Sequence, residues 1–166
     1  FERIKFRGAE HKYFVVDLGY PRFNEVDAYK VMWNGHYVNY FETSRFYYGK
    51  YMNLGTQLFE EAGYQIPIYS YTVQMRNVVT QDERIRVGVR PVSFKKGLLD
   101  LFHILMVGNE IKAVGNIIHA VIEKDTRSIP YPIPDLVTNI VTRVFKPFVE
   151  EMDLGVSKHK PEASPS

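Results

Sequence analysis

The sequence predicts an α+β domain in which one antiparallel sheet packs against a long helix. Three observations carry this prediction. The chain has 166 residues, which suits a single domain. Aromatic and apolar residues recur at helical spacing after position 34, and several runs of strand-forming residues with short turns between them follow Pro67. Strands joined by short turns must be antiparallel, and a helix with one apolar face needs a sheet to cover that face.

The first half of the chain alternates between strand and helix patterns. We expect a strand over 13–18, a loop over 22–33, a long helix from Asn34 and a shorter helix over 54–62. In the long helix, positions 37, 41, 44, 48 and 51 advance in steps of three and four. The side chain of Asn34 is suited to cap the first turn. Gly63 is suited to end the shorter helix, because glycine readily adopts the left-handed conformation.

The second half reads as four strands and a final helix. The strands are expected over 68–80, 83–92, 98–107 and 111–123, and the helix from Asp135. The run 98–107 is apolar on both faces, which predicts a strand near the centre of a covered sheet. The domain then spans residues 13–149, between a charged N-terminal extension, 1–12, and a polar C-terminal tail, 150–166.

Composition disfavours several classes of function. Lys and Arg number 21 against 19 Asp and Glu, so a general nucleic-acid binder is not expected. The chain contains no Cys, which excludes disulfides, thiolate nucleophiles and cysteine-type zinc sites. The spacing of His, Asp and Glu suggests no metal site, so we expect neither a metal nor another cofactor. No apolar run approaches the roughly 20 residues that cross a bilayer, and we expect a cytoplasmic protein without a membrane partner.

The segment 25–42 carries the most informative chemistry. Asp27 lies in a loop that leads into the N-terminus of the predicted long helix. Backbone amides without intrahelical acceptors and a partial positive charge gather at such an end, where they can stabilise an oxyanion. Gly35 would let a substrate approach the backbone closely. A carboxylate with an oxyanion hole suffices for acyl transfer from a thioester. The alternative is that Asp27 merely caps its loop, the commoner role of such a residue.

This segment also resembles a known family. The pattern Asp27-Ala28-x-x-Val31-x-x-Asn34-x-x-Tyr37-x-x-Tyr40-Phe41-Glu42 is similar to the signature of hotdog-fold acyl-CoA thioesterases of the 4-hydroxybenzoyl-CoA thioesterase type. The order of elements agrees from about Tyr13 to Asp135. The resemblance implies a sheet wrapped around a central helix, and two subunits that pair their sheets edge to edge with active sites at the interface. A homodimer or homotetramer is therefore expected. The family usually has Gly where this chain has Lys30.

Carried over by position, the resemblance implies roles for individual residues. Asp27 would act as nucleophile or general base, and the amides at Asn34 and Gly35 would polarise the thioester carbonyl. Tyr37 matches a frequent family Tyr at the substrate. Glu42 is a second carboxylate, at an offset that another hotdog branch uses. Eight helical residues span about 12 Å, so Glu42 could act on a carbonyl held near Asn34 only across a subunit interface.

We prefer Asp27, because a charged helix residue is rarely both buried and catalytic. The alternative for Glu42 is an ion pair with Arg45 or a capped buried carboxylate. His36 could donate a hydrogen bond near the carbonyl or serve in packing. The remaining candidates are basic: Arg84 and Arg86 with Arg90 on one strand face, and Lys95 and Lys96 in the next turn, could hold the phosphates of coenzyme A or form a solvated face. His103 and His119 are expected to be core residues with satisfied hydrogen bonds.

The sequence thus predicts an enzyme of fatty acid metabolism that hydrolyses an acyl thioester to a free acid and a thiol. The substrate partner is an acyl-CoA or an acyl carrier protein thioester. A non-catalytic acyl-binding module on the same fold is the alternative. A dehydratase of the hotdog type ranks lower, because its usual His-then-Glu pairing is not clearly present.

Overall fold

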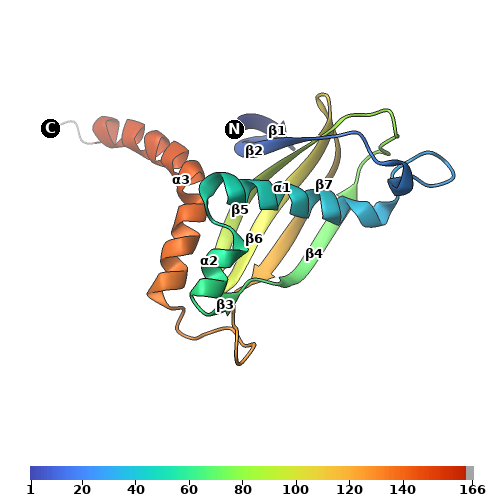
Figure 1. Cartoon of the computed structure of the whole chain (residues 1–166). Coiled ribbons are helices and arrows are strands. Elements are labelled where there is room, and N and C mark those ends of the chain that lie inside the picture. The colour runs from blue at the N-terminus through green and yellow to red at the C-terminus, as the bar shows by residue number, and fades with distance from the viewer. Residues whose placement is uncertain (164–166) are drawn as a thin grey trace.

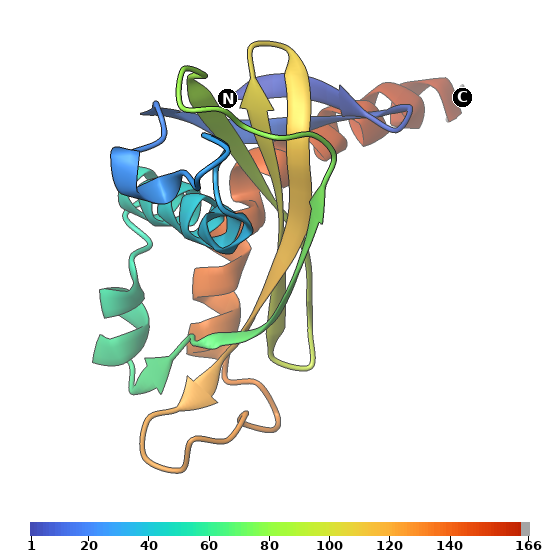
Figure 2. The ribbon, with the colours of Figure 1, turned by 90° about the vertical axis from the view of Figure 1, so that its right-hand side faces the viewer.

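Six antiparallel strands form one sheet that curves around a long helix (Figures 1 and 2). The computed structural model describes residues 1–163, with side chains through Val149. In the sheet, the strand order is β1-β2-β5-β6-β7-β4. The strands are β1 (Glu2–Phe6), β2 (Ala9–Gly19), β4 (Ile68–Met75), β5 (Ile85–Lys95), β6 (Leu98–Val107) and β7 (Glu110–Ala120), beside a small pair, β3 (Tyr64–Gln65) and β8 (Ile122–Glu123).

The helices lie on the concave face of the sheet. They are α1 (Tyr37–Met52), α2 (Thr56–Glu61) and α3 (Asp135–Ala163), and two 3-10 turns, η1 (Phe23–Glu25) and η2 (Asn34–His36), precede α1. The α+β class predicted from the periodicities is therefore confirmed. Gly63 has φ of +91°, and it follows the short helix as its conformational freedom suggested.

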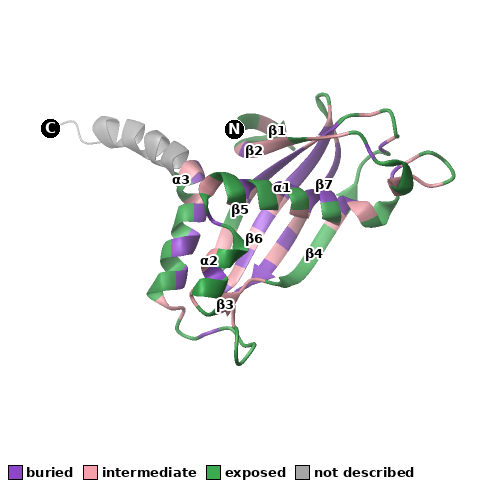
Figure 3. Ribbon diagram, in the orientation of Figure 1, coloured by how far each residue is buried: buried purple, intermediate pink, exposed green. Residues whose placement is uncertain are grey.

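The core lies between α1 and the central strands (Figure 3). Phe41 on α1 is fully buried against Val87 on β5 and Ile117 on β7. A Cβ at Gly115 on β7 would lie 2.3 Å from the Thr72 carbonyl oxygen and 2.9 Å from the Phe41 ring. Only glycine therefore lets α1 and the β4 backbone approach β7 this closely. The strand β6, expected to be central, has β5 and β7 as its neighbours.

The helix α3 extends this layer beside α1. Val137, Val141 and Val144 pack in one buried cluster with Tyr48 of α1. The Tyr48 hydroxyl also donates a hydrogen bond of 2.7 Å to the Val144 carbonyl. The backbone of α3 continues into the range expected as a tail, and the side chains of residues 150–166 lie outside those that the structure describes.

The expected loose N-terminal extension is wrong. Residues 2–6 form β1, which pairs with β2 from Glu2 opposite Tyr13 to Phe6 opposite Ala9. Ile4 and Phe6 pack on the convex face of the sheet, where they cover the buried Tyr13. The charged residues between them face solvent, so a charge count over the segment hides an alternating strand pattern.

The strand expected over 68–80 ends early, at Met75. The amides of Arg76 and Asn77 both donate to the Lys112 carbonyl, which turns the chain away from the sheet. Residues 79 and 80 then support the loop before α1: the Met32 amide donates 2.7 Å to the Val79 carbonyl, and Val31 bridges to Thr80. This irregular segment holds the candidate site in place.

Among the described residues, no helix has both the length and the apolar character needed to cross a membrane.

Candidate active site

Residues 25–33 form a short hairpin that leads into the helix. The Asp27 amide donates 2.9 Å to the Val31 carbonyl, and the Trp33 amide donates 2.9 Å to the Glu25 carbonyl. At its tip, Lys30 has φ of +60°. The resembling family usually has Gly there, and glycine adopts this left-handed conformation without a steric penalty. The substitution to Lys therefore keeps the shape of the turn.

The Asp27 carboxylate is half-buried and oriented by its own turn. Its Oδ1 accepts hydrogen bonds from the Tyr29 amide at 2.8 Å and the Val31 amide at 3.4 Å. Both of these bonds go to Oδ1, so Oδ2 accepts none from any residue that the structure describes. The capping role is thus present, and it leaves one oxygen available for chemistry.

The helix begins differently from the prediction. Trp33 occupies the N-cap position without a side-chain hydrogen bond, and Asn34 is the first residue of η2, so the expected Asn34 cap is wrong. The Asn34 carbonyl instead accepts the Tyr37 amide. The amides of Asn34 and Gly35 stand at the first two positions, where helix geometry supplies no acceptor. They remain the potential oxyanion donors.

Gly35 permits a close approach to its backbone, but the group that approaches is a side chain of the same protein, Trp33. A Cβ at this position would lie 2.0 Å from Cζ3 of Trp33, so the indole covers the α-carbon of Gly35. The expected open approach for a substrate is therefore occupied by Trp33. The ring of His36 meets the indole edge-on at 5.6 Å between centroids, which gives His36 a packing role here.

Asp27 and the helix start belong to the same hairpin but do not touch. Asp27 lies opposite Val31 in the hairpin. Val31 precedes Asn34 by three residues, which span about 10 Å along an extended backbone. Within the described part of the chain, no hydrogen bond joins the Asp27 side chain to Asn34 or Gly35. A substrate carbonyl placed between them would have to bridge this gap.

Tyr37, an expected substrate contact, is a core residue. Its side chain is only 2% exposed and packs with Met32 and Ile85. Burial raises the pKa of its hydroxyl, and the nearby Glu83 carboxylate raises it further. The helical position one turn from the start faces the sheet, so the Tyr37 side chain lies in the core, and its contact with a substrate stays a prediction.

The basic residues expected at the coenzyme phosphates do not gather at the hairpin. Arg84 pairs with Asp17 at 2.8 Å, and Arg86 pairs with Glu2 at 2.8 Å. Ile85 and Val87 pack toward α1, so by strand alternation Arg86 points to the opposite face of the sheet. Lys95 and Lys96 stand in the β5–β6 turn, at the far end of β5 from Ile85. Arg84 and Arg86 therefore lie in ion pairs at the surface of the sheet.

A polar cleft of about 450 Å³ lies between the end of β2, η1 and α1. The Tyr40 hydroxyl donates 2.7 Å to Oε1 of Glu25, and the Arg22 amide donates to the same oxygen at 2.7 Å. Burial and this carboxylate raise the pKa of Tyr40. Neither motif nor spacing in the sequence signals this cleft, because three separate elements contribute to it.

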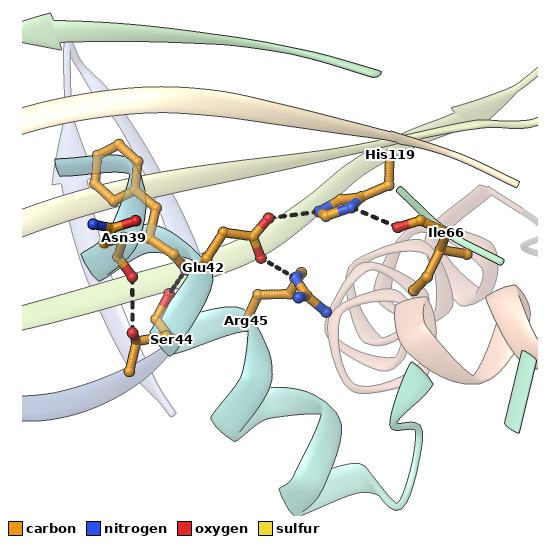
Figure 4. Close-up of polar contacts among 8 residues, drawn as sticks. Asn39, Glu42, Ser44, Arg45, Ile66 and His119 are labelled. Atoms are coloured by element: carbon orange, nitrogen blue, oxygen red, sulfur yellow. Dashed lines mark hydrogen bonds and ion pairs between the residues drawn. The ribbon is translucent and has the colours of Figure 1, made fainter. Parts of the chain in front are cut away.

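Glu42 forms the expected ion pair with Arg45, and a second contact that the sequence did not reveal (Figure 4). One oxygen, Oε2, accepts a hydrogen bond from Nε of Arg45. The other, Oε1, lies 3.6 Å from Nε2 of His119 on β7. His119 is 2% exposed, and its Nδ1 lies 3.2 Å from the Ile66 carbonyl.

The two strand histidines are buried as expected, but three of their four ring nitrogens lack a hydrogen-bond partner among the described residues. Among the described residues, neither ring nitrogen of His103 nor Nε2 of His119 has a hydrogen-bond partner. The ring of His103 stacks on Phe41, with centroids 5.0 Å apart. Burial lowers the pKa of His103 to about 3. Burial also lowers the pKa of His119, which the Glu42 carboxylate opposes.

Across the residues that the structure describes, no group of three or more His, Asp and Glu side chains is arranged to hold a metal ion.

Comparisons with known proteins agree with this architecture. The family model described as the thioesterase-like superfamily matches residues 21–148, which include the hairpin and α1. A search of curated protein sequences gave no significant match.

Three solved structures illustrate the similarity in fold. The chain is 18% identical to a DHNA-CoA thioesterase from Staphylococcus aureus, with 93% of this chain and 97% of that chain covered and a TM-score of 0.66. It is 22% identical to a thioesterase from Thermus thermophilus in complex with coenzyme A and Zn, with coverage of 80% and 92% and a TM-score of 0.63. For Slr0204, a 1,4-dihydroxy-2-naphthoyl-CoA thioesterase from Synechocystis, the identity is 11%, the coverage 78% and 96%, and the TM-score 0.68.

At these identities the likeness establishes the fold alone, and the fold is the hotdog arrangement of a sheet wrapped around a central helix. The specific 4-hydroxybenzoyl-CoA type stays a prediction. Since the family model spans the hairpin, α1, strands β4 to β7 and most of the described α3 side chains, the chain belongs to the thioesterase-like superfamily.

Proposed function

We propose that this protein hydrolyses an acyl-CoA thioester to a free acid and coenzyme A, with Asp27 as the catalytic carboxylate. Membership of the thioesterase-like superfamily supports the reaction class. The half-buried Asp27 carboxylate carries the proposal, because its turn fixes Oδ1 and leaves Oδ2 available. The neighbours that act on or contain coenzyme A support this thiol over an acyl carrier protein.

The proposed reaction needs no group outside the chain other than water. Asp27 accepts a proton from water as the water oxygen bonds to the acyl carbon, and the amides of Asn34 and Gly35 stabilise the resulting oxyanion. Collapse of the tetrahedral intermediate breaks the carbon–sulfur bond. The proton held by Asp27 then passes to the departing thiolate. A direct attack of Oδ2 on the carbonyl, followed by hydrolysis of the anhydride, gives the same products.

Glu42 is the second candidate for this role, and its surroundings favour it in one respect. Its Oε1 is buried beside His119 and accepts no hydrogen bond from the described residues. Since Glu42 lies eight residues beyond Asn34, it would act on a carbonyl held by a second subunit. Comparing Asp27→Asn with Glu42→Gln in one assay assigns the carboxylate, because only the reacting group should reduce turnover strongly.

A non-catalytic acyl-binding protein is the second candidate function. The observation in its favour is the Trp33 indole, which lies over the α-carbon of Gly35 and occupies space beside one of the two potential oxyanion donors. Thiol release over a panel of acyl-CoA chain lengths separates the two functions. A hydrolase releases coenzyme A from at least one member of the panel, whereas a binding protein retains every thioester intact.

We further propose that two copies pair through β4. This strand ends the sheet, with β7 as its neighbour on one side, and its residues are almost all exposed (Figure 3). Its apolar side chains include Tyr69, Tyr71 and Met75, which are 64%, 57% and 51% exposed. A flat apolar edge of this kind is prone to pair with another strand.

Tyr71→Asp is therefore expected to convert a dimer into a monomer, because it places a charge within the proposed interface. Size-exclusion chromatography with light scattering measures the mass directly. Tyr131→Asp is the matched control, since Tyr131 is 98% exposed in the loop between β8 and α3. An unchanged dimer in Tyr71→Asp would place the subunit contact elsewhere.

A further inference from the structure

The contact between Glu42 and His119 brings two hydrogen-bond acceptors together in a buried place (Figure 4). A carbonyl oxygen can only accept, so the 3.2 Å approach of His119 Nδ1 to the Ile66 carbonyl assigns the ring proton to Nδ1. In neutral His119, Nε2 is then a bare lone pair. It faces Oε1 of Glu42 at 3.6 Å, and both atoms are buried without another partner among the described residues.

This pair of acceptor atoms lacks a proton between them. Two acceptors without a proton repel each other, which fits a separation of 3.6 Å, beyond normal hydrogen-bond distance. One added proton would turn the contact into a charge-assisted hydrogen bond of about 2.8 Å. Because both atoms are shielded from water, neither can satisfy its lone pair otherwise.

The surrounding charges determine how readily the pair takes up that proton. From α1, Arg45 donates a hydrogen bond to the second oxygen of Glu42, and its charge opposes a cationic His119. From β6, His103 is fully buried with a strongly lowered pKa, and it therefore stays neutral near pH 7. From the segment before β4, the Ile66 carbonyl stabilises the protonated ring.

We propose that Glu42 and His119 form a proton-accepting pair, separate from Asp27, in which His119 is the positioning residue for Glu42, the second candidate for the catalytic carboxylate. The exposure of the two side chains gives this division of roles. The Glu42 side chain is 21% exposed, whereas His119, at 2%, can act only through Glu42.

The inference deepens the proposed hydrolase and rests on it for its catalytic consequence. Where Glu42 rather than Asp27 is the reacting carboxylate, the proton leaves a water molecule as that water's oxygen bonds to the acyl carbon, it is held between Oε1 and Nε2, and it passes to the departing thiolate. The pair itself, however, exists or fails to exist in the protein without substrate.

The first experiment therefore uses the full chain without ligand. Long-range ¹H–¹⁵N correlation spectra of the histidine rings, recorded from pH 4 to pH 8, report the tautomer and the titration of each ring nitrogen. We expect His119 to keep its Nδ1 proton throughout, with Nε2 gaining a proton as the pH falls. In Glu42→Gln the titration of Nε2 should move to lower pH, because the carboxylate no longer stabilises the cation. An Nε2-protonated tautomer at pH 8, or identical titrations in both proteins, would overturn the pair.

The second experiment measures kcat and KM against pH with two substitutions at one position. His119→Gln can donate a hydrogen bond to Glu42 but cannot take up a proton, and we expect the acidic limb of its kcat profile to move. His119→Asn can still donate to the Ile66 carbonyl but no longer reaches Glu42, and we expect kcat to fall about tenfold with KM nearly unchanged. A purely structural role predicts the wild-type pH profile in His119→Gln.

The two experiments distinguish the two proposals. If the wild-type protein releases no thiol but Glu42→Gln moves the titration of His119 Nε2 to lower pH, the hydrolase is refuted and the pair is supported. Thiol release with no such response would refute the pair and leave the hydrolase.

Discussion

Asp27→Asn is expected to lower turnover of an acyl-CoA at least about a hundredfold while the protein stays folded. The Oδ1 of asparagine can still accept the hydrogen bonds from the Tyr29 and Val31 amides, so the hairpin keeps its shape. The amide nitrogen that replaces Oδ2, however, can neither accept a proton nor attack a carbonyl. Release of coenzyme A, followed with a thiol reagent, measures the effect.

Asp125→Asn is the matched control, because it makes the same chemical change in an exposed loop. Circular dichroism and thermal unfolding check that both variants are folded. Turnover of Asp27→Asn at the wild-type rate would remove Asp27 from the reaction. If Glu42→Gln is the inactive variant instead, the catalytic carboxylate lies on α1.

Acidification is expected to destabilise the fold through His103. The ring is fully buried, and burial lowers its pKa from 6.5 to about 3. The unfolded chain therefore binds a proton below pH 6.5 that the folded protein does not bind until about pH 3. The contribution of His103 to stability is complete above pH 6.5 and is lost as the pH falls, by about 2 kcal/mol between pH 8 and pH 5 and about 5 kcal/mol over the whole window.

Urea unfolding of the wild type and of His103→Phe, each at pH 8 and pH 5, measures this loss. Phenylalanine preserves the stacking on Phe41 and removes the titrating group. We expect the fall in the free energy of unfolding to be smaller by about 2 kcal/mol in the variant. His119 and His11, whose pKa values burial also lowers, leave a residual dependence of the same sign.

The carboxylates act mainly below the pH 8 to pH 5 range of this comparison. The pKa values of Asp17 and Glu83 are lowered in the folded protein, so their contribution is present above their ordinary values near 4 and is lost below them. Comparison at pH 5 and above therefore isolates the histidines. An equal pH dependence in wild type and His103→Phe would show that His103 does not remain neutral in the fold.

The sequence by itself determined the class of the fold and the place of the candidate site. Helical spacing from Tyr37 to Tyr51, the apolar run of β6 and the turn at Lys96–Gly97 are each set by residues close together in the chain. The periodicity of apolar side chains and the residue preferences of turns are short-range properties, so they can be recognised without knowledge of the tertiary contacts. The motif around Asp27 is local in the same way.

Only the tertiary structure decided which side chains meet. It buried Tyr37, laid Trp33 over Gly35, added β1 to the sheet and paired Arg84 with Asp17. The most consequential case is Glu42 beside His119, 77 positions apart in the sequence. Such a contact depends on the order of the strands, their register and the line along which α1 crosses them, and none of these is encoded in the spacing of either residue. Burial then changes the chemistry, because a carboxylate and an imidazole shielded from water must satisfy each other.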